Sequence, residues 1–377
     1  MASNFEDKLR DAIAALQRGD WRTTEELCAQ LLGNAPEHPS ALHVLGVLRL
    51  QQGNVAAALE LLRRVSQLEP ANFQAIEDLG TAELSLRRFP EAEAQFRKAL
   101  ALGKRDASLC SWLGIALASQ ERHADAVEYF QQAVAAEPRN PGFWINLGNA
   151  QRALGRLEEA VAGYRSALES APDYADAMVG LAAALLLTGK MDEALDWCRS
   201  ALALDPDHLE ARYRMAAALG VKGEFAQALS ILEAVIARAP DHADVITESG
   251  IALLGLGRFP EAEQRFRQAV ALNPGNAEAH CNLARALLSQ DRPEEAIACC
   301  RQALALQPDD PEATQGMGVI LFRQQRVEEA IACHEKVLAL KPDHAQAHYS
   351  LGIARYAQGR VRDGMDSFEK ALQLKPY

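Results

Sequence analysis

The chain has 377 residues, of which 49% are hydrophobic and only 6% aromatic, and its formal net charge is −12. The negative charge and the lack of a Lys/Arg run exclude a general nucleic-acid binder, because affinity for phosphates depends on clustered cations. Seven cysteines, an odd number in a chain long enough to build its own core, exclude a disulfide framework. Because Ala and Leu dominate and no stretch of about 20 apolar residues occurs, we expect an all-α, reduced, cytoplasmic protein without direct membrane insertion.

The chain begins with residues 1–4, which we expect to be a short N-terminal extension. A 34-residue pattern starts at Phe5 and forms a first repeat over residues 5–38. This repeat is atypical, because Lys8 and Ala12 stand where most later repeats have a larger apolar side chain and a glycine. We interpret it as the N-terminal cap of an array, since a terminal repeat has one face without a neighbour.

The same pattern then continues to residue 377 without an insertion. In each repeat the eighth and twentieth places hold a small residue, and the twenty-fourth usually holds a larger one, as in the pair Gly114 and Phe130. Small places opposite large ones indicate two helices that approach closely. The eleven repeats start at Phe5, Pro39, Phe73, Ala107, Pro141, Ala175, Leu209, Ala243, Ala277, Pro311 and Ala345.

Each repeat carries its own start and stop signals. A glycine at the fifteenth place, such as Gly155, offers the left-handed conformation that ends the first helix. An acid in the first turn of the second helix, such as Glu159, complements the positive end of the helix dipole. Proline at the thirty-second place, as in Pro172, stops the second helix before the next repeat begins. The pattern therefore predicts eleven helix-turn-helix pairs.

The fifth repeat shows the pattern most fully, with the sequence PGFWINLGNAQRALGRLEEAVAGYRSALESAPDY over residues 141–174. Its Trp144, Gly148, Ala160 and Tyr164 are spaced as in the tetratricopeptide repeat family, and residues 5–377 resemble that family throughout. The resemblance implies a single right-handed superhelical solenoid of eleven repeats. It also implies a non-catalytic scaffold that binds a peptide or partner protein in a concave groove lined by the first helices.

Two alternatives stay open. The run from Asp309 to Arg360 is similar to the arrays that precede the catalytic domain in O-GlcNAc transferase-like proteins and bacterial repeat-sulfotransferases, so these residues could be the substrate-recognition part of a larger transferase. Only Asn146 and Asn282 match the groove asparagine ladder of the former. The other alternative is self-association through the last repeat, where Phe368 and Leu372 have no neighbouring repeat in the sequence.

Candidate groove residues stand at places two, five, six, nine, twelve and thirteen of the first helices. Trp, Tyr and Arg dominate binding energy at protein interfaces, and Asn and Arg can bond a peptide backbone. An acid at the second place of repeats six to ten suggests a ledge for a basic ligand, although an acid in a first helical turn is stabilised there in any case. The predicted site residues are Trp112, Asn146, Asn149, Arg152, Tyr213, Arg214, Asn282, Arg285, Phe322, Arg323, Tyr349 and Tyr356.

No motif for catalysis, cofactor binding or metal binding stands out, and we expect no enzyme activity in these residues. Cys281, Cys300 and His334 could be imagined as metal ligands, but Cys300 and His334 are one full repeat apart, which separates them by about 10 Å, so a shared ion is out of reach. The expected partner is therefore a protein or peptide.

Overall fold

The computed structural model describes the backbone of residues 2–374 and the side chains of residues 5–374. Within this part of the chain the secondary structure consists of 22 α-helices and no strands. Two helices per 34-residue repeat give eleven pairs, which confirms the predicted all-α solenoid of helix-turn-helix repeats. No helix among these residues has both the length and the apolar character needed to cross a membrane.

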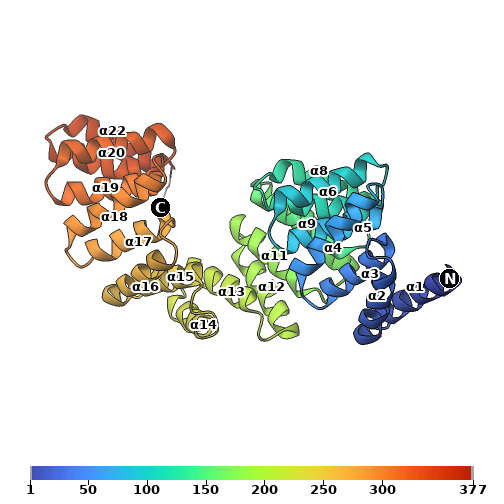
Figure 1. Ribbon diagram of the computed structural model, residues 1–377. Coiled ribbons are helices and arrows are strands. Elements are labelled where there is room, and N and C mark those ends of the chain that lie inside the picture. The colour runs from blue at the N-terminus through green and yellow to red at the C-terminus, as the bar shows by residue number, and fades with distance from the viewer. Residues whose placement is uncertain (1, 375–377) are drawn as a thin grey trace. The chain divides into compact units, whose positions relative to one another are not determined.

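The chain forms two compact units, and each is described by itself (Figure 1). The N-terminal half is Met1–Lys190. In it each helix packs against the next, and the first helices of neighbouring repeats also touch. Its helices are α1 (Ala2–Gln17), α2 (Trp21–Asn34), α3 (Pro39–Gln51), α4 (Val55–Leu68), α5 (Phe73–Ser85), α6 (Phe89–Ala101), α7 (Ala107–Ala118), α8 (His123–Ala136), α9 (Pro141–Ala153), α10 (Leu157–Ser170) and α11 (Ala175–Leu187).

The C-terminal half is Met191–Tyr377 and repeats the same arrangement. Figure 1 shows its helices in yellow-green to red. They are α12 (Met191–Leu204), α13 (Leu209–Val221), α14 (Phe225–Arg238), α15 (Ala243–Gly255), α16 (Phe259–Leu272), α17 (Ala277–Leu288), α18 (Pro293–Leu306), α19 (Pro311–Arg323), α20 (Val327–Leu340), α21 (Ala345–Ala357) and α22 (Val361–Leu374).

The two helices of a repeat are held together by the predicted contact between a small and a large residue. Phe130 and Phe266 are almost completely buried. A Cβ atom added to Gly114 would lie 2.5 Å from the Phe130 ring, and one added to Gly250 would lie 2.6 Å from Phe266. Only glycine permits this approach of the first helix to an aromatic ring, so the predicted packing is confirmed.

The turn between the two helices has one backbone conformation throughout the array. Its residue at the fifteenth place has a positive φ in every repeat, which confirms the role predicted for the glycines there. The seven glycines have φ between 73° and 81°, and the four other residues between 58° and 62°. These residues are Gly19, Gly53, Arg87, Glu121, Gly155, Gly189, Gly223, Gly257, Asp291, Gln325 and Gly359.

The ends of the array differ in detail from the expected boundaries. Helix α1 begins at Ala2, so residues 2–4, which we predicted as an extension, are the first residues of that helix. The predicted end of the last repeat, at residues 375–377, lies outside the described part of the chain.

Candidate functional site

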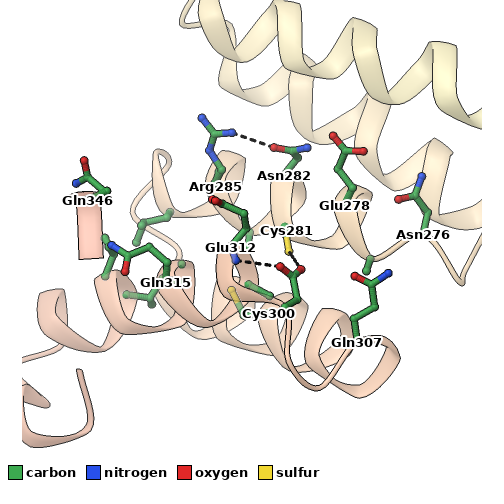
Figure 2. Close-up of a pocket in the computed structure, with 18 of the residues that line it drawn as sticks. Asn276, Glu278, Cys281, Asn282, Arg285, Cys300, Gln307, Glu312, Gln315 and Gln346 are labelled. Atoms are coloured by element: carbon green, nitrogen blue, oxygen red, sulfur yellow. Dashed lines mark hydrogen bonds between the residues drawn. The ribbon is translucent and has the colours of Figure 1, made fainter. Parts of the chain in front are cut away.

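A groove-side pocket lies in the C-terminal half, between α17 and α19. It has a volume of about 880 Å³. Figure 2 shows Glu278, Asn282 and Arg285 of α17 and Glu312 and Gln315 of α19 around it. These are the second, fifth, sixth and ninth places of the first helices, where the sequence predicts the groove. We call this pocket the α17–α19 pocket.

The lining of the α17–α19 pocket is rich in hydrogen-bonding groups. Five side-chain amides face it, together with three carboxylates and a single guanidinium, that of Arg285. Carboxylates accept hydrogen bonds only, whereas amides both donate and accept, so the pocket can pair with a peptide backbone and with a cationic side chain. The amides belong to Asn276, Asn282, Gln307, Gln315 and Gln346, and the carboxylates to Glu278, Asp310 and Glu312.

Hydrogen bonds fix several of these groups before any ligand binds. Arg285 donates from Nη1 to Oδ1 of Asn282 over 3.0 Å. Asp310 caps α19 by accepting from the backbone N–H of Glu312 over 2.9 Å, and its other oxygen receives the Cys281 thiol at 3.8 Å. These contacts are the dashed lines of Figure 2. Because the side chains are already oriented, less conformational entropy is lost when a partner binds.

A buried polar chain supports the floor of the pocket. The Gln315 amide donates from Nε2 to Oγ of Ser350 over 2.9 Å, and its Oε1 lies 2.8 Å from Nδ1 of His334. His334 occupies the large twenty-fourth place and is 1% exposed. Burial lowers the pKa of His334 to about 4, so the ring is neutral at pH 7, and Nδ1 carries the proton because Oε1 can only accept.

Acidic groups continue along the neighbouring first helices of the C-terminal half. Glu248 of α15 is half-buried, and its pKa is raised to about 7 by burial first, then by the charges of Glu278 and Asp244. Desolvation, with the Asp244 charge, also raises the pKa of Glu278. Carboxylates that share a poorly solvated surface resist full ionisation, and a nearby cation relieves that cost.

Three of the four predicted site residues of the N-terminal half are held by contacts within the fold. Trp112 is half-buried, and its ring stacks on Phe96 at a centroid distance of 6.0 Å. Asn146 donates to Oγ of Ser111 over 3.2 Å. Asn149 accepts from the Tyr164 hydroxyl over 2.7 Å. Arg152 is half-buried, and its buried Nε has no hydrogen-bond partner among the described residues.

The predicted residues on α13 form their own cluster in the C-terminal half. The Arg214 guanidinium lies 4.9 Å from the centre of the Tyr213 ring and pairs with the Glu210 carboxylate at 2.7 Å. Burial raises the pKa of the Tyr213 hydroxyl. Tyr213 and Arg214 therefore both contact neighbouring side chains of the fold.

The remaining predicted residues lie on α17, α19 and α21. Only Asn282 and Arg285 line the α17–α19 pocket. Phe322 packs on the core around Leu351, and Arg323 is exposed. The two tyrosines of α21 are more open, since Tyr349 is 48% and Tyr356 57% exposed.

Tyr349 also borders a second hollow, on the last repeat. This hollow has a volume of about 710 Å³ and lies between α21 and α22. The Tyr349 ring is 5.6 Å from that of Phe368, which lines the hollow with Ala371 and Leu372. An apolar hollow of this kind is a surface where another protein segment can pack.

Several pocket residues were missed by sequence reasoning. Glu278 and Glu312 were noted only as members of the acidic run at the second place, and Gln315 was not selected at all. The acidic run was a usable signal, because it reaches the pocket at both residues. Gln315 gave no signal of its own, since its role depends on the contact with His334, 19 residues away.

The cysteines do not form a reactive or metal-binding centre in the described residues. All seven thiols are free. Burial raises the pKa of Cys281 and of Cys300 to about 12, so both remain protonated at neutral pH. Among residues 5–374 no three His, Cys, Asp or Glu side chains gather closely enough to hold a metal ion.

Comparison with family models agrees with the repeat pattern. A model described as "Tetratricopeptide repeat" matches residues 9–72, 77–141, 145–208 and 247–311, which is more than half of the chain. A second model with the same description matches residues 189–247. A third, described as "TPR repeat", matches residues 318–359. No match was found among curated proteins.

Solved structures with the same fold cover nearly the whole chain. The human IFIT1 dimer with m7Gppp-AAAA has a TM-score of 0.58 at 16% identity and covers 90% of this chain and 91% of its own. The Cut9-Hcn1 hetero-tetramer of the APC/C has a TM-score of 0.52 at 17% identity, over 98% and 87%. A tetratricopeptide repeat protein from Parabacteroides merdae has a TM-score of 0.54 at 18% identity, over 66% and 98%. At these identities the likeness shows the fold alone.

Proposed function

This chain belongs to the tetratricopeptide repeat family, and from that premise we propose that it is a non-catalytic scaffold that binds a cationic segment of a partner protein in the α17–α19 pocket. The Cut9-Hcn1 structure, which shares the fold, is a hetero-tetramer, so a partner-binding role is in keeping with the fold. Nucleic acid is not part of the proposal, because the net charge of −12 opposes phosphate binding.

The observation that carries the proposal is the charge balance of the α17–α19 pocket. Three carboxylates face the single guanidinium of Arg285, and that guanidinium is already bonded to Asn282. A Lys or Arg side chain of the partner would therefore meet uncompensated negative charge. Complementary charge of this kind favours the correct partner and speeds its approach.

The amides give the same pocket a means to hold the partner's backbone. Asn276, Gln307 and Gln346 lie at its rim, and Gln315 is fixed at its floor by His334. Each amide can satisfy one backbone N–H or C=O of an extended segment. Together, the amides would fix the segment and the carboxylates would select its charge.

The acids of α13 and α15 extend the proposed binding surface beyond the pocket. Glu210, Asp244 and Glu278 stand at the second place of successive first helices, so they recur once per repeat. Burial raises the pKa of Glu248, and the negative charges of Glu278 and Asp244 raise it further. A segment longer than the pocket would thus find further partners for its cations on these two helices.

The test uses two labelled nonapeptides, one alternating alanine with arginine and one alternating alanine with glutamate, in fluorescence anisotropy titrations. We expect the wild type to prefer the arginine peptide, and the double variant Glu278→Gln, Glu312→Gln to bind it about tenfold more weakly, since exposed charge pairs contribute up to about 1 kcal/mol each. The matched control is Glu294→Gln, Glu328→Gln, which removes the same charge from the second helices α18 and α20. Equal weakening in both double variants would mean general attraction by the net charge and would reject the site.

Self-association through the last repeat is a second proposal, and the hollow around Tyr349 and Phe368 supports it. A second copy could cover this apolar face. Light scattering over a concentration series should then show a mass above the 41.0 kDa of one chain.

We also propose a cytoplasmic location, because seven free thiols are typical of a reducing compartment.

A further inference from the structure

The N-terminal half has an apolar pocket on the side of α9 that faces away from the predicted groove. It has a volume of about 460 Å³ and lies between α8 and α10, above Trp144, Leu147 and Gln151 of α9. Trp144 and Gln151 are seven residues apart and share one helix face, whereas the groove residue Asn149 is five residues from Trp144 and points the opposite way. We call this pocket the Gly163 pocket, after the residue of α10 that opens it.

The pocket exists because Gly163 has no side chain. It stands at the twenty-third place, where the other repeats have Leu27, Leu61, Gln95, Tyr129, Trp197, Ile231, Arg265, Cys299, Cys333 and Ser367. A Cβ atom added to Gly163 would meet its nearest neighbour, the Trp144 carbonyl oxygen, at 3.5 Å, which is ordinary contact. Packing therefore does not require glycine here, in contrast to the glycines at the eighth place.

The preceding repeat shows what kind of side chain fits at this place. There Tyr129 of α8 packs on the apolar core that includes Leu113, Phe130 and Leu147. Trp144 packs on the same core and is fixed by a 2.8 Å hydrogen bond from its Nε1 to the Pro138 carbonyl. An aromatic ring that enters the Gly163 pocket would find the face of a second, rigidly held aromatic ring.

The base of the pocket also contains a polar atom without a partner. Gln151 is 5% exposed, and its Nε2 donates to the Glu159 carboxylate over 3.1 Å. Because a carboxylate can only accept, this bond fixes which end of the amide is the nitrogen. Oε1 then faces Gly163, at 3.6 Å from a Cβ placed there, and no donor of the described residues reaches it.

An unpaired acceptor beneath apolar walls favours one class of occupant. A purely aliphatic side chain would leave Oε1 unsatisfied, and a charged one would lose its hydration to the apolar walls. An indole combines a large apolar ring with a single N–H donor. The last torsion of glutamine is broad, so a small rotation brings Oε1 to the donor.

We propose that the Gly163 pocket is a second docking site, which takes a tryptophan side chain of a partner protein. The indole ring would pack against Trp144, in the space equivalent to the one that Tyr129 fills in the preceding repeat. Its N–H would donate a hydrogen bond to Oε1 of Gln151. This site is independent of the α17–α19 pocket, because it lies in the other half of the chain, between the second helices α8 and α10.

The probe is N-acetyl-L-tryptophanamide, which carries a peptide bond on each side of the residue, measured by saturation-transfer NMR with the full chain. We expect a dissociation constant on the order of 1 mM for so small a ligand. Gly163→Leu fills the pocket with the residue of the first two repeats and should weaken binding at least tenfold. Cys333→Leu introduces the same residue at the twenty-third place of the tenth repeat and should leave binding unchanged.

A second ligand tests the hydrogen bond. The 1-methylindole analogue of the probe cannot donate and should bind the wild type about fivefold more weakly than the parent, as loss of one hydrogen bond predicts. Gln151→Leu, which has the residue of six other repeats at this place, should bind the two ligands equally. Circular dichroism confirms that each variant is folded. Absence of binding to the wild type, or undiminished binding to Gly163→Leu, would overturn the proposal.

Discussion

The two halves of the molecule share one architecture and differ in the surface that the first helices present. In the N-terminal half this surface has few charges, and its polar groups are bonded within the fold, as Asn146 is to Ser111 and Asn149 to Tyr164. In the C-terminal half the same places hold Glu248 and Glu278, with raised pKa values, beside a pocket lined by amides. The difference teaches that recognition in this array depends on the variable places, while the repeated places build the helices.

The large twenty-fourth place shows the same contrast inside the core. In the N-terminal half it holds Phe96, Phe130 and Tyr164 in successive repeats, whereas the C-terminal half has Cys300 and then His334 there. His334 needs a hydrogen-bond partner that a phenylalanine does not need, and Gln315 provides it. The core of the C-terminal half is therefore coupled to the floor of its pocket.

The largest effect should come from truncation of the core in either half. Phe130→Ala and Phe266→Ala each remove a ring that fills the space opposite a glycine, at a cost of about 3–5 kcal/mol. Because each repeat contacts only its neighbours, hydrogen exchange should show lost protection in the half that carries the substitution. Glu128→Ala, on the exposed face of α8, is the control. An unchanged unfolding midpoint in both phenylalanine variants would contradict the packing.

The next largest effect should be a loss of stability at low pH, which His334 causes in the C-terminal half. Its pKa is about 4 in the folded chain and about 6.5 when exposed, so the unfolded state binds the proton first and stability falls as the pH drops from 6.5 to 4. The expected loss is about 3 kcal/mol. Denaturation of the wild type and of His334→Phe at several pH values measures it, and parallel pH curves would contradict it.

Glu248 acts in the opposite direction and needs its own variant. Its folded pKa of about 7 is above the unfolded value, so its contribution to stability is present below pH 4.5 and is lost as the pH rises through 7. Because the two opposing slopes partly cancel between pH 4.5 and 6.5, Glu248→Gln should make the loss of stability on acidification steeper there. The slope that remains in this variant then belongs to His334 and not to the acidic surface.

The smallest effect on stability should come from glycine substitutions in the turn within a repeat, and it should be equal in the two halves. Glu121 and Gln325 have a positive φ of 62° and 61° at the turn within a repeat. Because a left-handed conformation is unfavourable for a residue with a Cβ, glycine at either position should stabilise the fold by about 1 kcal/mol. Gly155→Ala, at the same place with φ of 73°, should destabilise it by a similar amount. Thermal unfolding of the three variants measures these changes, and stabilisation by glycine in only one half would contradict the prediction.

The sequence was enough to predict the repeat architecture, because the signals recur. Close packing of Gly114 on Phe130 and the left-handed turn at Gly155 follow from residue size and from the absence of a Cβ atom. Each is a local requirement that one repeat must meet, and eleven repeats in register leave little room for another interpretation. The fold class was therefore determined by the sequence alone.

The candidate site was only partly predictable. Residues at the predicted groove places line the α17–α19 pocket, but among them only Asn282 and Arg285 were predicted as site residues, and Glu278, Glu312 and Gln315 were not. A large or aromatic residue attracted attention because such residues dominate interfaces in general. In the structure Trp112 stacks on the core instead.

What only the tertiary structure decided was which polar groups are already bonded and where space is left. A neighbour one repeat away fixes Asn146 and Gln315, the partner helix of the same repeat fixes Asn149, and the missing side chain at Gly163 leaves a pocket that no local pattern predicts. The physical reason is that helix formation depends on residues within a turn or two, whereas a cavity or an unpaired acceptor depends on every side chain that packs around it.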